Sequence, residues 1–127
     1  MLIQAFKADK KVLLCGNGGS AADAQLIAAE LSGRYMLNRP ALFAEALHVN
    51  SSYMTAVSND FGFDETYKRL VQGFGREGDV LIALSTSGNS KNIVAAAKEA
   101  LNVGMKVIGF SGANGGLLKD HSTLCFQ

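Results

Sequence analysis

The fold is decided by residues 80–90, which read Val80-Leu81-Ile82-Ala83-Leu84-Ser85-Thr86-Ser87-Gly88-Asn89-Ser90. The apolar run at its start is typical of a buried strand, and residues 91–103 after it have the composition of a helix. A helix that begins here directs its unpaired N–H groups and its positive dipole end at the turn. The segment therefore predicts an anion site on a turn at Gly88, lined by four hydroxyl side chains: Ser85, Thr86, Ser87 and Ser90.

Two interpretations of these hydroxyls stay open. Ser87 or Ser90 could simply cap the following helix, because a serine oxygen accepts a hydrogen bond from a first-turn N–H. A cap needs only one hydroxyl, however, so four within six residues favour phosphate binding. No Gly-Lys-Ser/Thr follows, which excludes a nucleoside triphosphate loop and makes a sugar phosphate the better ligand.

The order of strand, polar loop and helix occurs three times in the chain. Residues 11–15 run into Gly16-Asn17-Gly18-Gly19-Ser20, and residues 79–84 run into residues 85–90, called here the hydroxyl loop. Residues 106–110 run into residues 111–116. Continuous apolar strands with helices between them predict a parallel sheet that is covered on both faces. We therefore expect an α/β fold, a doubly wound three-layer sandwich around about five parallel strands, with the ligand at their carboxyl edge.

The other elements are expected from composition. An alanine-rich helix is predicted at residues 21–31, with Ser20 as its cap and Gly33 as its stop. Glu45 interrupts an apolar strand pattern, which favours an exposed edge strand over a functional carboxylate. The remaining expectations are a strand at 41–49, short helices at 50–57 and 63–74, a turn at 58–62 and a final strand at 122–127.

Length and charge limit the classes of function. The chain has 127 residues, which suits one soluble domain, and its net charge of +1 comes from 12 basic and 11 acidic residues. There is no basic block, so we expect neither a nucleic-acid partner nor a membrane surface. Nothing resembles a membrane span or a secretory signal, so we expect a cytoplasmic protein. Cys15 and Cys125 are interpreted as reduced packing residues.

The glycine-rich loop after the first strand partly matches the dinucleotide fingerprint. That fingerprint requires an acidic residue about 20 positions later, and residues 36–38 offer none. We interpret Asn17, Gly18, Gly19 and Ser20 as a second polar loop that faces the same ligand. A tight turn without a ligand is the alternative.

Two carboxylates are open to a functional or a structural interpretation. Glu30 lies ten residues after Ser20, about 15 Å along the predicted helix, and is either a solvated surface charge or a general base. Asp60 either forms an Asx turn with its own backbone or binds substrate hydroxyls.

Five segments together carry a family resemblance: residues 15–25, 28–35, 59–63, 75–81 and 85–90. They read Cys-Gly-Asn-Gly-Gly-Ser-Ala-Ala-Asp-Ala-Gln, Ala-Ala-Glu-Leu-Ser-Gly-Arg-Tyr, Asn-Asp-Phe-Gly-Phe, Gly-Arg-Glu-Gly-Asp-Val-Leu and Ser-Thr-Ser-Gly-Asn-Ser. In combination they resemble the phosphoheptose isomerase (sedoheptulose 7-phosphate isomerase) family, which has the SIS, or sugar isomerase, fold. The resemblance implies one SIS domain over residues 1–127 that lacks most of the family's N-terminal helix and its C-terminal helix.

The resemblance also implies roles for individual residues. Glu30 matches the family's catalytic glutamate, which would move a proton between adjacent carbons through an enediol. The reaction implied is conversion of sedoheptulose 7-phosphate to D-glycero-D-manno-heptose 7-phosphate for lipopolysaccharide or related glycans. The phosphate would be held by Ser85, Thr86, Ser87 and Ser90, and the sugar by Asn17, Gly18, Gly19, Ser20, Asn59 and Asp60.

Two further implications concern metal and assembly. Many members place a histidine four residues before the glutamate and bind zinc there, but this chain has Leu26 at that position, which cannot ligate a metal. His48 and His121 occupy other positions and are expected to be surface or hydrogen-bonded strand-end residues. The resemblance also implies a homo-oligomer, a homotetramer by comparison with the family, with sites between its subunits.

Two competing functions are kept. The first is a non-catalytic SIS module that binds a sugar phosphate or a protein, similar to the DnaA initiator-associating protein, and Leu26 favours it. The second is a dinucleotide-binding domain, which the missing ribose carboxylate disfavours.

Overall fold

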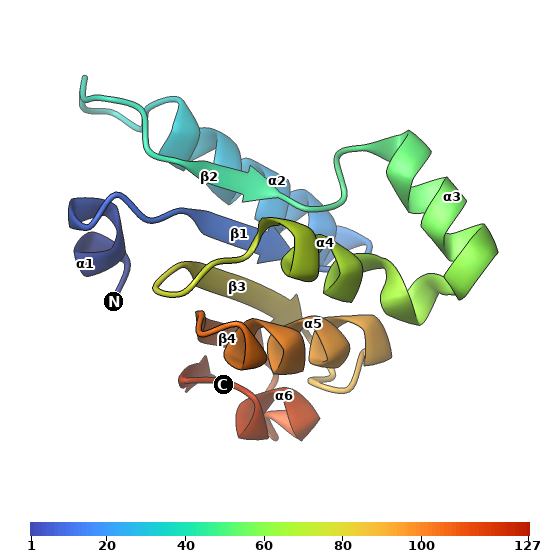
Figure 1. Ribbon diagram of the computed structural model, residues 1–127. Helices are drawn as coiled ribbons and strands as arrows, with labels where there is room; N and C mark the ends of the chain where they lie inside the picture. Colours follow the sequence, from blue (N-terminus) through green and yellow to red (C-terminus); the bar gives the residue numbers. More distant parts are fainter.

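Helices and strands alternate along the computed structural model, which describes residues 1–127 (Figure 1). The elements are α1 (Leu2–Lys7), β1 (Val12–Cys15), α2 (Gly19–Ser32), β2 (Ala44–Ala46), α3 (Ser51–Phe61), a 3-10 helix η1 (Phe63–Glu65), α4 (Thr66–Phe74), β3 (Val80–Ser85), α5 (Lys91–Asn102), β4 (Lys106–Ser111), α6 (Gly116–Asp120) and β5 (Leu124–Phe126). Each of the three predicted strand–loop–helix units is present. No helix has the length and apolar character needed to span a membrane.

The sheet has five strands in the order β2-β1-β3-β4-β5, and every pair is parallel. The chain first moves outward from β1 to β2 and then returns to the other side of β1 with β3. The loops that follow β1 and β3 therefore diverge at a topological switch point, where open α/β sheets bind their ligands. The predicted doubly wound α/β fold is confirmed.

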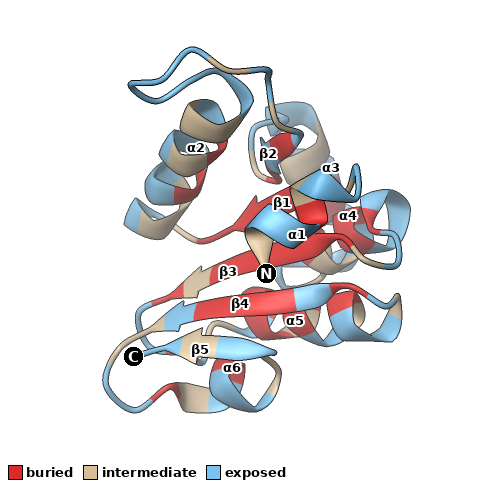
Figure 2. Ribbon diagram, turned by 90° about the vertical axis from the view of Figure 1, so that its left-hand side faces the viewer, coloured by how far each residue is buried: buried red, intermediate tan, exposed pale blue.

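Alternating residues of the central strands point to opposite faces of the sheet. Leu13, Leu81 and Val107 pack with residues of α4 and α5, whereas Val12, Leu14 and Val80 pack with residues of α1 and α2. Figure 2 shows β1, β3 and β4 buried between these helical layers. Complete burial of a side chain of this size contributes about 1.5–3 kcal/mol, so the two cores stabilise the strands that carry the loops.

Two local expectations are wrong. The strand expected at 41–49 contracts to Ala44–Ala46, because β2 is an edge strand with β1 as its single neighbour. The expected turn at 58–62 is helical up to Phe61, and the helix ends only at Gly62, whose φ is 90°. The helix predicted after the third loop is present as the short helix α6, over residues 116–120.

Glu45 supports the edge-strand interpretation. Its side chain is exposed between the buried residues Ala44 and Ala46 of β2. This alternation of buried and exposed residues is what an edge strand with one covered face requires.

Candidate functional site

The hydroxyl loop joins the end of β3 to the start of α5. Gly88 has a φ of 65°, and a Cβ at this position would overlap the carbonyl oxygen of Gly115. The loop is fixed against the loop that follows β4, because the N–H of Gly112 donates to the carbonyl of Thr86 at 2.9 Å. The N–H of Leu118 donates to the carbonyl of Gly88 at the same distance. Two loops from neighbouring strands thus form one rigid surface.

The hydroxyls of this loop do not cap α5. Ser90 occupies the N-cap position but makes no capping hydrogen bond through its side chain. Instead the Ser85 hydroxyl donates to the Ser90 hydroxyl at 3.0 Å, and the Ser87 hydroxyl accepts from the N–H of Asn89 at 3.1 Å. The capping interpretation is therefore wrong for both Ser87 and Ser90.

A cavity of about 240 Å³ opens at the carboxyl edge between α2 and the ends of β3 and β4. It brings together three of the predicted residues, Ser20, Ser85 and Thr86. Ser87 and Ser90 do not line it. The complete lining is Ser20, Asp23, Leu84, Ser85, Thr86, Phe110, Ser111 and Gly112.

Sequence reasoning missed two polar residues of this cavity, although both carried a signal. Ser111 pairs in register with Ser85, so it ends its strand at the same level of the sheet. Asp23 lies three residues after Ser20 on α2 and thus on the same helix face. Ser111 is placed by the register of the sheet, and Asp23 by the phase of helix α2.

The helix that follows the glycine loop after β1 begins earlier than expected. Helix α2 begins at Gly19 with Gly18 as its N-cap at a φ of 55°, so the prediction of Ser20 as the cap is wrong. A Cβ at Gly16 would lie 2.5 Å from the carbonyl oxygen of Ser20, which restricts that position to glycine. The Tyr67 hydroxyl donates to the carbonyl of Gly16 at 2.6 Å. Burial raises the pKa of Tyr67, which keeps it protonated as a donor.

Asn17 pairs with Asn92 of α5. The Nδ2 of each residue donates to the Oδ1 of the other, and both distances are 2.9 Å. Asn17 is half-buried, while Asn92 is buried. The Asn17 side chain thus already has a protein partner, and it joins the two loops.

The fold separates Glu30 from the cavity. Helix α2 starts at the carboxyl edge with Gly19 and runs back to the opposite edge, where Glu30 lies in its last turn (Figure 1). From Ser20 to Glu30 the axial distance is about 15 Å. The Glu30 side chain is half-buried and has no hydrogen-bond partner, while its carbonyl accepts from Nη2 of Arg39 at 2.8 Å.

Asn59 and Asp60 are also outside the cavity. Both are exposed near the end of α3, and Nδ2 of Asn59 donates to Oδ1 of Asp60 at 2.9 Å. Because these residues are helical, the Asx-turn interpretation of Asp60 is wrong. Figure 1 shows α3 projecting beyond the carboxyl edge of the sheet.

The residues around Glu30 do not fit a zinc site. Leu26 lies one turn before Glu30 with 61% of its surface exposed, and no three His, Cys, Asp or Glu side chains gather anywhere in the chain. His48 faces Oε1 of Gln25 at 3.2 Å through Nε2, but its Nδ1 is buried without a partner. Partial burial lowers the pKa of His48. His48 is thus half-buried and hydrogen-bonded through Nε2 alone, which agrees in part with the expected surface or hydrogen-bonded residue.

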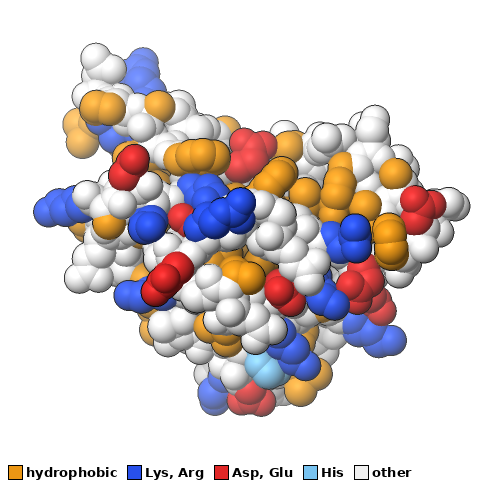
Figure 3. Space-filling view, in the orientation of Figure 1, with side chains coloured by type: hydrophobic (Ala, Val, Ile, Leu, Met, Phe, Trp, Pro, Cys, Tyr) orange, Lys and Arg blue, Asp and Glu red, His pale blue; other side chains and the backbone are white.

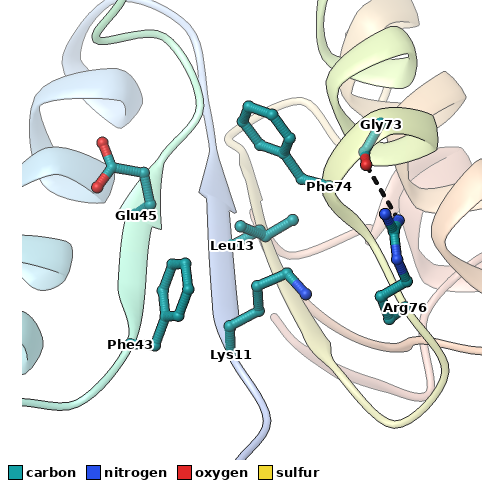
Figure 4. Close-up of a pocket in the computed structure, with 7 residues that line it drawn as sticks. All are labelled: Lys11, Leu13, Phe43, Glu45, Gly73, Phe74 and Arg76. Atoms are coloured by element: carbon teal, nitrogen blue, oxygen red, sulfur yellow. Dashed lines mark hydrogen bonds between the residues drawn. The ribbon is translucent and has the colours of Figure 1, made fainter.

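A larger cavity, of about 410 Å³, lies beside β2 on the face covered by α4 (Figure 4). Its basic groups are already engaged, because Lys11 pairs with the buried Asp79 and Nη1 of Arg76 donates to the carbonyls of Gly73 and Gly75. Figure 3 shows basic side chains beside hydrophobic ones on this side of the molecule. None of the predicted site residues lines this cavity, whereas Ser20, Ser85 and Thr86 line the one at the carboxyl edge.

Comparison with known proteins gives a consistent group of relatives. A family model for the SIS domain matches residues 1–112. The chain is 54% identical to the phosphoheptose isomerase of Clostridium acetobutylicum over 95% of its own length and 62% of that protein. The corresponding enzyme of Rhodospirillum rubrum is 52% identical, with 97% of this chain and 65% of the relative covered. The chain thus spans less than two thirds of these relatives.

Two solved structures resemble nearly the whole chain. The phosphoheptose isomerase GmhA of Neisseria gonorrhoeae is 45% identical with a TM-score of 0.88, covering 97% of this chain and 66% of that one. A phosphoheptose isomerase of Francisella tularensis is 36% identical with a TM-score of 0.89, and the match covers 96% of this chain and 66% of that one. The resemblance expected from the motifs is confirmed.

Proposed function

Because the chain belongs to the SIS domain family, we propose that it is the sugar-phosphate-binding domain of a phosphoheptose isomerase. The observation that carries this proposal is the carboxyl-edge cavity, in which Ser20, Ser85 and Thr86 meet. The relatives named phosphoheptose isomerase support the same class of substrate. The proposed reaction converts sedoheptulose 7-phosphate to D-glycero-D-manno-heptose 7-phosphate, a sugar for lipopolysaccharide or related glycans.

The phosphate is held by neutral donors. No lysine or arginine lines the cavity, so the negative charge is met by hydroxyls, by N–H groups and by the positive end of the α5 dipole. Thr86 and Ser85 contact the phosphate directly. Ser87 and Ser90 complete the loop, and Ser90 accepts a hydrogen bond from the Ser85 hydroxyl, whose hydrogen must turn away from Ser90 to donate to the phosphate.

The sugar extends toward the glycine loop. Gly18 and Gly19 present their backbone there with open space at their Cα atoms, and Ser20 follows in the first turn of α2. Asn59 and Asp60 would add hydrogen bonds to the hydroxyls from α3. Backbone donors and short side chains of this kind suit the many hydroxyls of a heptose.

Glu30 supplies the proton transfer, and we propose that it serves the cavity of a second subunit. Isomerisation needs a base that removes a proton from one carbon and returns it to the next, which a carboxylate can do. Within one chain Glu30 is about 15 Å from Ser20 along α2, too far for one sugar phosphate to reach both. A homo-oligomer, a tetramer by family resemblance, would bring the two halves together.

Mixed oligomers test the shared site. Glu30→Ala and Thr86→Val should each abolish most turnover when assayed alone. Subunits of the two variants, dissociated and reassembled together, should regain activity, because some sites then combine an intact Glu30 with an intact Thr86. No recovery in verified mixed oligomers would contradict a shared site.

The function itself is tested by turnover of sedoheptulose 7-phosphate, with Glu30→Gln as the control that keeps shape and hydrogen bonding. We expect aldose product from the wild type and at least a hundredfold less from Glu30→Gln, the scale of general base catalysis. Turnover that is unaffected by Glu30→Gln would exclude Glu30 as the base.

A second candidate is a non-catalytic SIS module, similar to the DnaA initiator-associating protein. The separation of Glu30 from the cavity and the presence of Leu26 favour it. It predicts saturable binding of the sugar phosphate with no product at any protein concentration. The turnover assay therefore separates the two candidates.

A further inference from the structure

One buried residue, Asn92, connects the two loops of the proposed site. The residue is 2% exposed, and its side chain makes three hydrogen bonds. Two join it to Asn17 in a closed amide pair, and the third is accepted by its Oδ1 from the N–H of Ile93 at 3.0 Å. The partners Asn17 and Asn92 are 75 residues apart in the chain.

Each asparagine of the pair belongs to a different part of the site. Asn92 lies in the first turn of α5, two residues after Ser90, at the helix end proposed to hold the phosphate. Asn17 directly precedes Gly18 and Gly19, the backbone proposed to meet the sugar. The pair is thus a direct side-chain link between the hydroxyl loop, proposed to hold the phosphate, and the glycine loop before α2, called here the sugar loop.

The sugar loop needs such a link. A Cβ placed on Gly18 or Gly19 would meet nothing within 4 Å, so no packing holds this turn from outside. Glycine backbone without neighbouring contacts has many accessible conformations. Backbone hydrogen bonds from the N–H groups of Ser20, Ala21 and Ala22 to the carbonyls of Asn17 and Gly18 join the loop to its own helix, α2. Beyond α2, side chains fix the loop at two points, the Tyr67 hydroxyl on the Gly16 carbonyl and Asn92 on Asn17.

We propose that Asn92 is a positioning residue for the sugar, acting through Asn17 to hold the glycine loop at a fixed place relative to the bound phosphate. The inference rests on the proposed function of the site. The chemistry requires an amide at both positions, because each side chain donates to and accepts from the other. Removal of Asn92 leaves the amide of Asn17 without its partner and releases the loop.

Affinity for two ligands distinguishes positioning from a merely structural role. Inorganic phosphate reports on the hydroxyl loop alone, while sedoheptulose 7-phosphate reports on both loops. We expect Asn92→Ala to weaken sugar phosphate binding at least tenfold by calorimetry, and phosphate binding less than threefold. Asn102→Ala, at the exposed end of the same helix, is the matched control and should change neither.

A double variant tests whether Asn92 acts through Asn17. Adding Asn92→Ala to Asn17→Ala should cause no further loss of sugar phosphate affinity, because the loop is already released. If Asn92→Ala does not melt cooperatively, the smaller change Asn92→Ser, which cannot reach Asn17, replaces it. Serine is tolerated near a helix start.

The outcomes are separable. Equal loss of affinity for both ligands, or further loss in the double variant, would overturn the positioning role while leaving the proposed function intact. Unchanged sugar phosphate affinity in Asn92→Ala and Asn92→Ser would do the same. A wild type that binds inorganic phosphate but not sedoheptulose 7-phosphate would overturn the proposed function and the inference with it.

Discussion

Ser85 and Ser111 lie side by side at the carboxyl ends of β3 and β4, paired in register, and both line the cavity between these strands and α2. Ser85 is buried at 4% exposure and donates to Ser90, while Ser111 donates to the carbonyl of Gly112 at 3.2 Å. Two hydroxyls therefore lie next to each other in the lining of the cavity, and each has a protein hydrogen-bond partner. This arrangement favours an oxygen-rich ligand and gives the following predictions.

Gly88→Ala should lower both stability and phosphate affinity. The φ of 65° costs a non-glycine residue about 1–2 kcal/mol, and the new methyl group would also overlap the Gly115 carbonyl. We expect a loss of at least about 2 kcal/mol in the free energy of unfolding, measured with urea. Gly73→Ala is the control, since a Cβ there meets nothing within 4 Å and α4 should gain about 0.5–1 kcal/mol. A neutral Gly88→Ala would contradict the packing of the two loops.

Asp23→Asn should increase the affinity for inorganic phosphate. The Asp23 carboxylate lines the same cavity as Ser85 and Thr86, and like charges repel at this range. We expect a gain of about threefold to tenfold at low ionic strength that shrinks as salt is added. Glu77→Gln removes a charge just before β3, at the opposite edge of the sheet, and should have no effect. Weaker phosphate binding by Asp23→Asn would show that phosphate binds elsewhere.

Asp79→Ala should destabilise the protein without changing the site. Asp79 is 2% exposed, pairs with Lys11, and accepts hydrogen bonds from the N–H groups of Lys11 and Arg76 at 3.1 and 2.8 Å. Loss of one partner from a buried pair costs about 3–5 kcal/mol. The control Lys68→Ala breaks the exposed pair with Glu65 and should cost less than about 1 kcal/mol. Phosphate affinity of folded Asp79→Ala should equal that of the wild type, and a large difference would contradict a purely structural role.

Cys15 should make unfolding sensitive to alkali. Burial raises the pKa of its thiol from 9.0 to about 12. The folded state therefore binds the proton more tightly than the unfolded chain, so the contribution to stability is complete below pH 9.0 and is lost as the pH rises toward 12. We expect the free energy of unfolding to fall more steeply over this window in the wild type than in Cys15→Ala. Identical slopes would exclude a buried, protonated thiol.

The same burial predicts a difference between the two cysteines. Cys15 is fully buried in β1, whereas Cys125 is half-buried in the edge strand β5. A thiol reagent at pH 8 should label Cys125 in the native protein and both residues in urea. Native labelling of Cys15 at the rate of Cys125 would contradict the packing of β1.

The central strands were predictable because their apolar runs are long and buried on both faces. Leu13, Leu81 and Val107 are in the core where continuous hydrophobicity indicated. The edge strand was not predictable in length, since β2 is limited by its pairing with β1 and not by its own composition. The Asn-Asp-Phe-Gly run has the composition of a turn but forms the end of helix α3, which stops at Phe61 because Gly62 has a φ of 90°.

The site was predictable as a pair of loops but not as a set of contacts. Ser85 and Thr86 were identified from local composition, whereas Ser111 and Asp23 depend on strand register and helix phase. Asn92 looked like an ordinary helical residue, and its pairing with Asn17 emerges only from the fold. The roles of Glu30, Asn59 and Asp60 stay predictions, because within one chain they lie away from the cavity.

The most direct measurement is a titration with sedoheptulose 7-phosphate followed by backbone amide chemical shifts. If the carboxyl-edge cavity binds the sugar phosphate, the largest shifts should occur at Thr86, Ser87 and Ser90 and at Gly18 to Ser20. They should be absent at Phe43 and Phe74, which line the larger cavity beside β2. Saturable shifts at Phe43 and Phe74 with none in the hydroxyl loop would contradict the account.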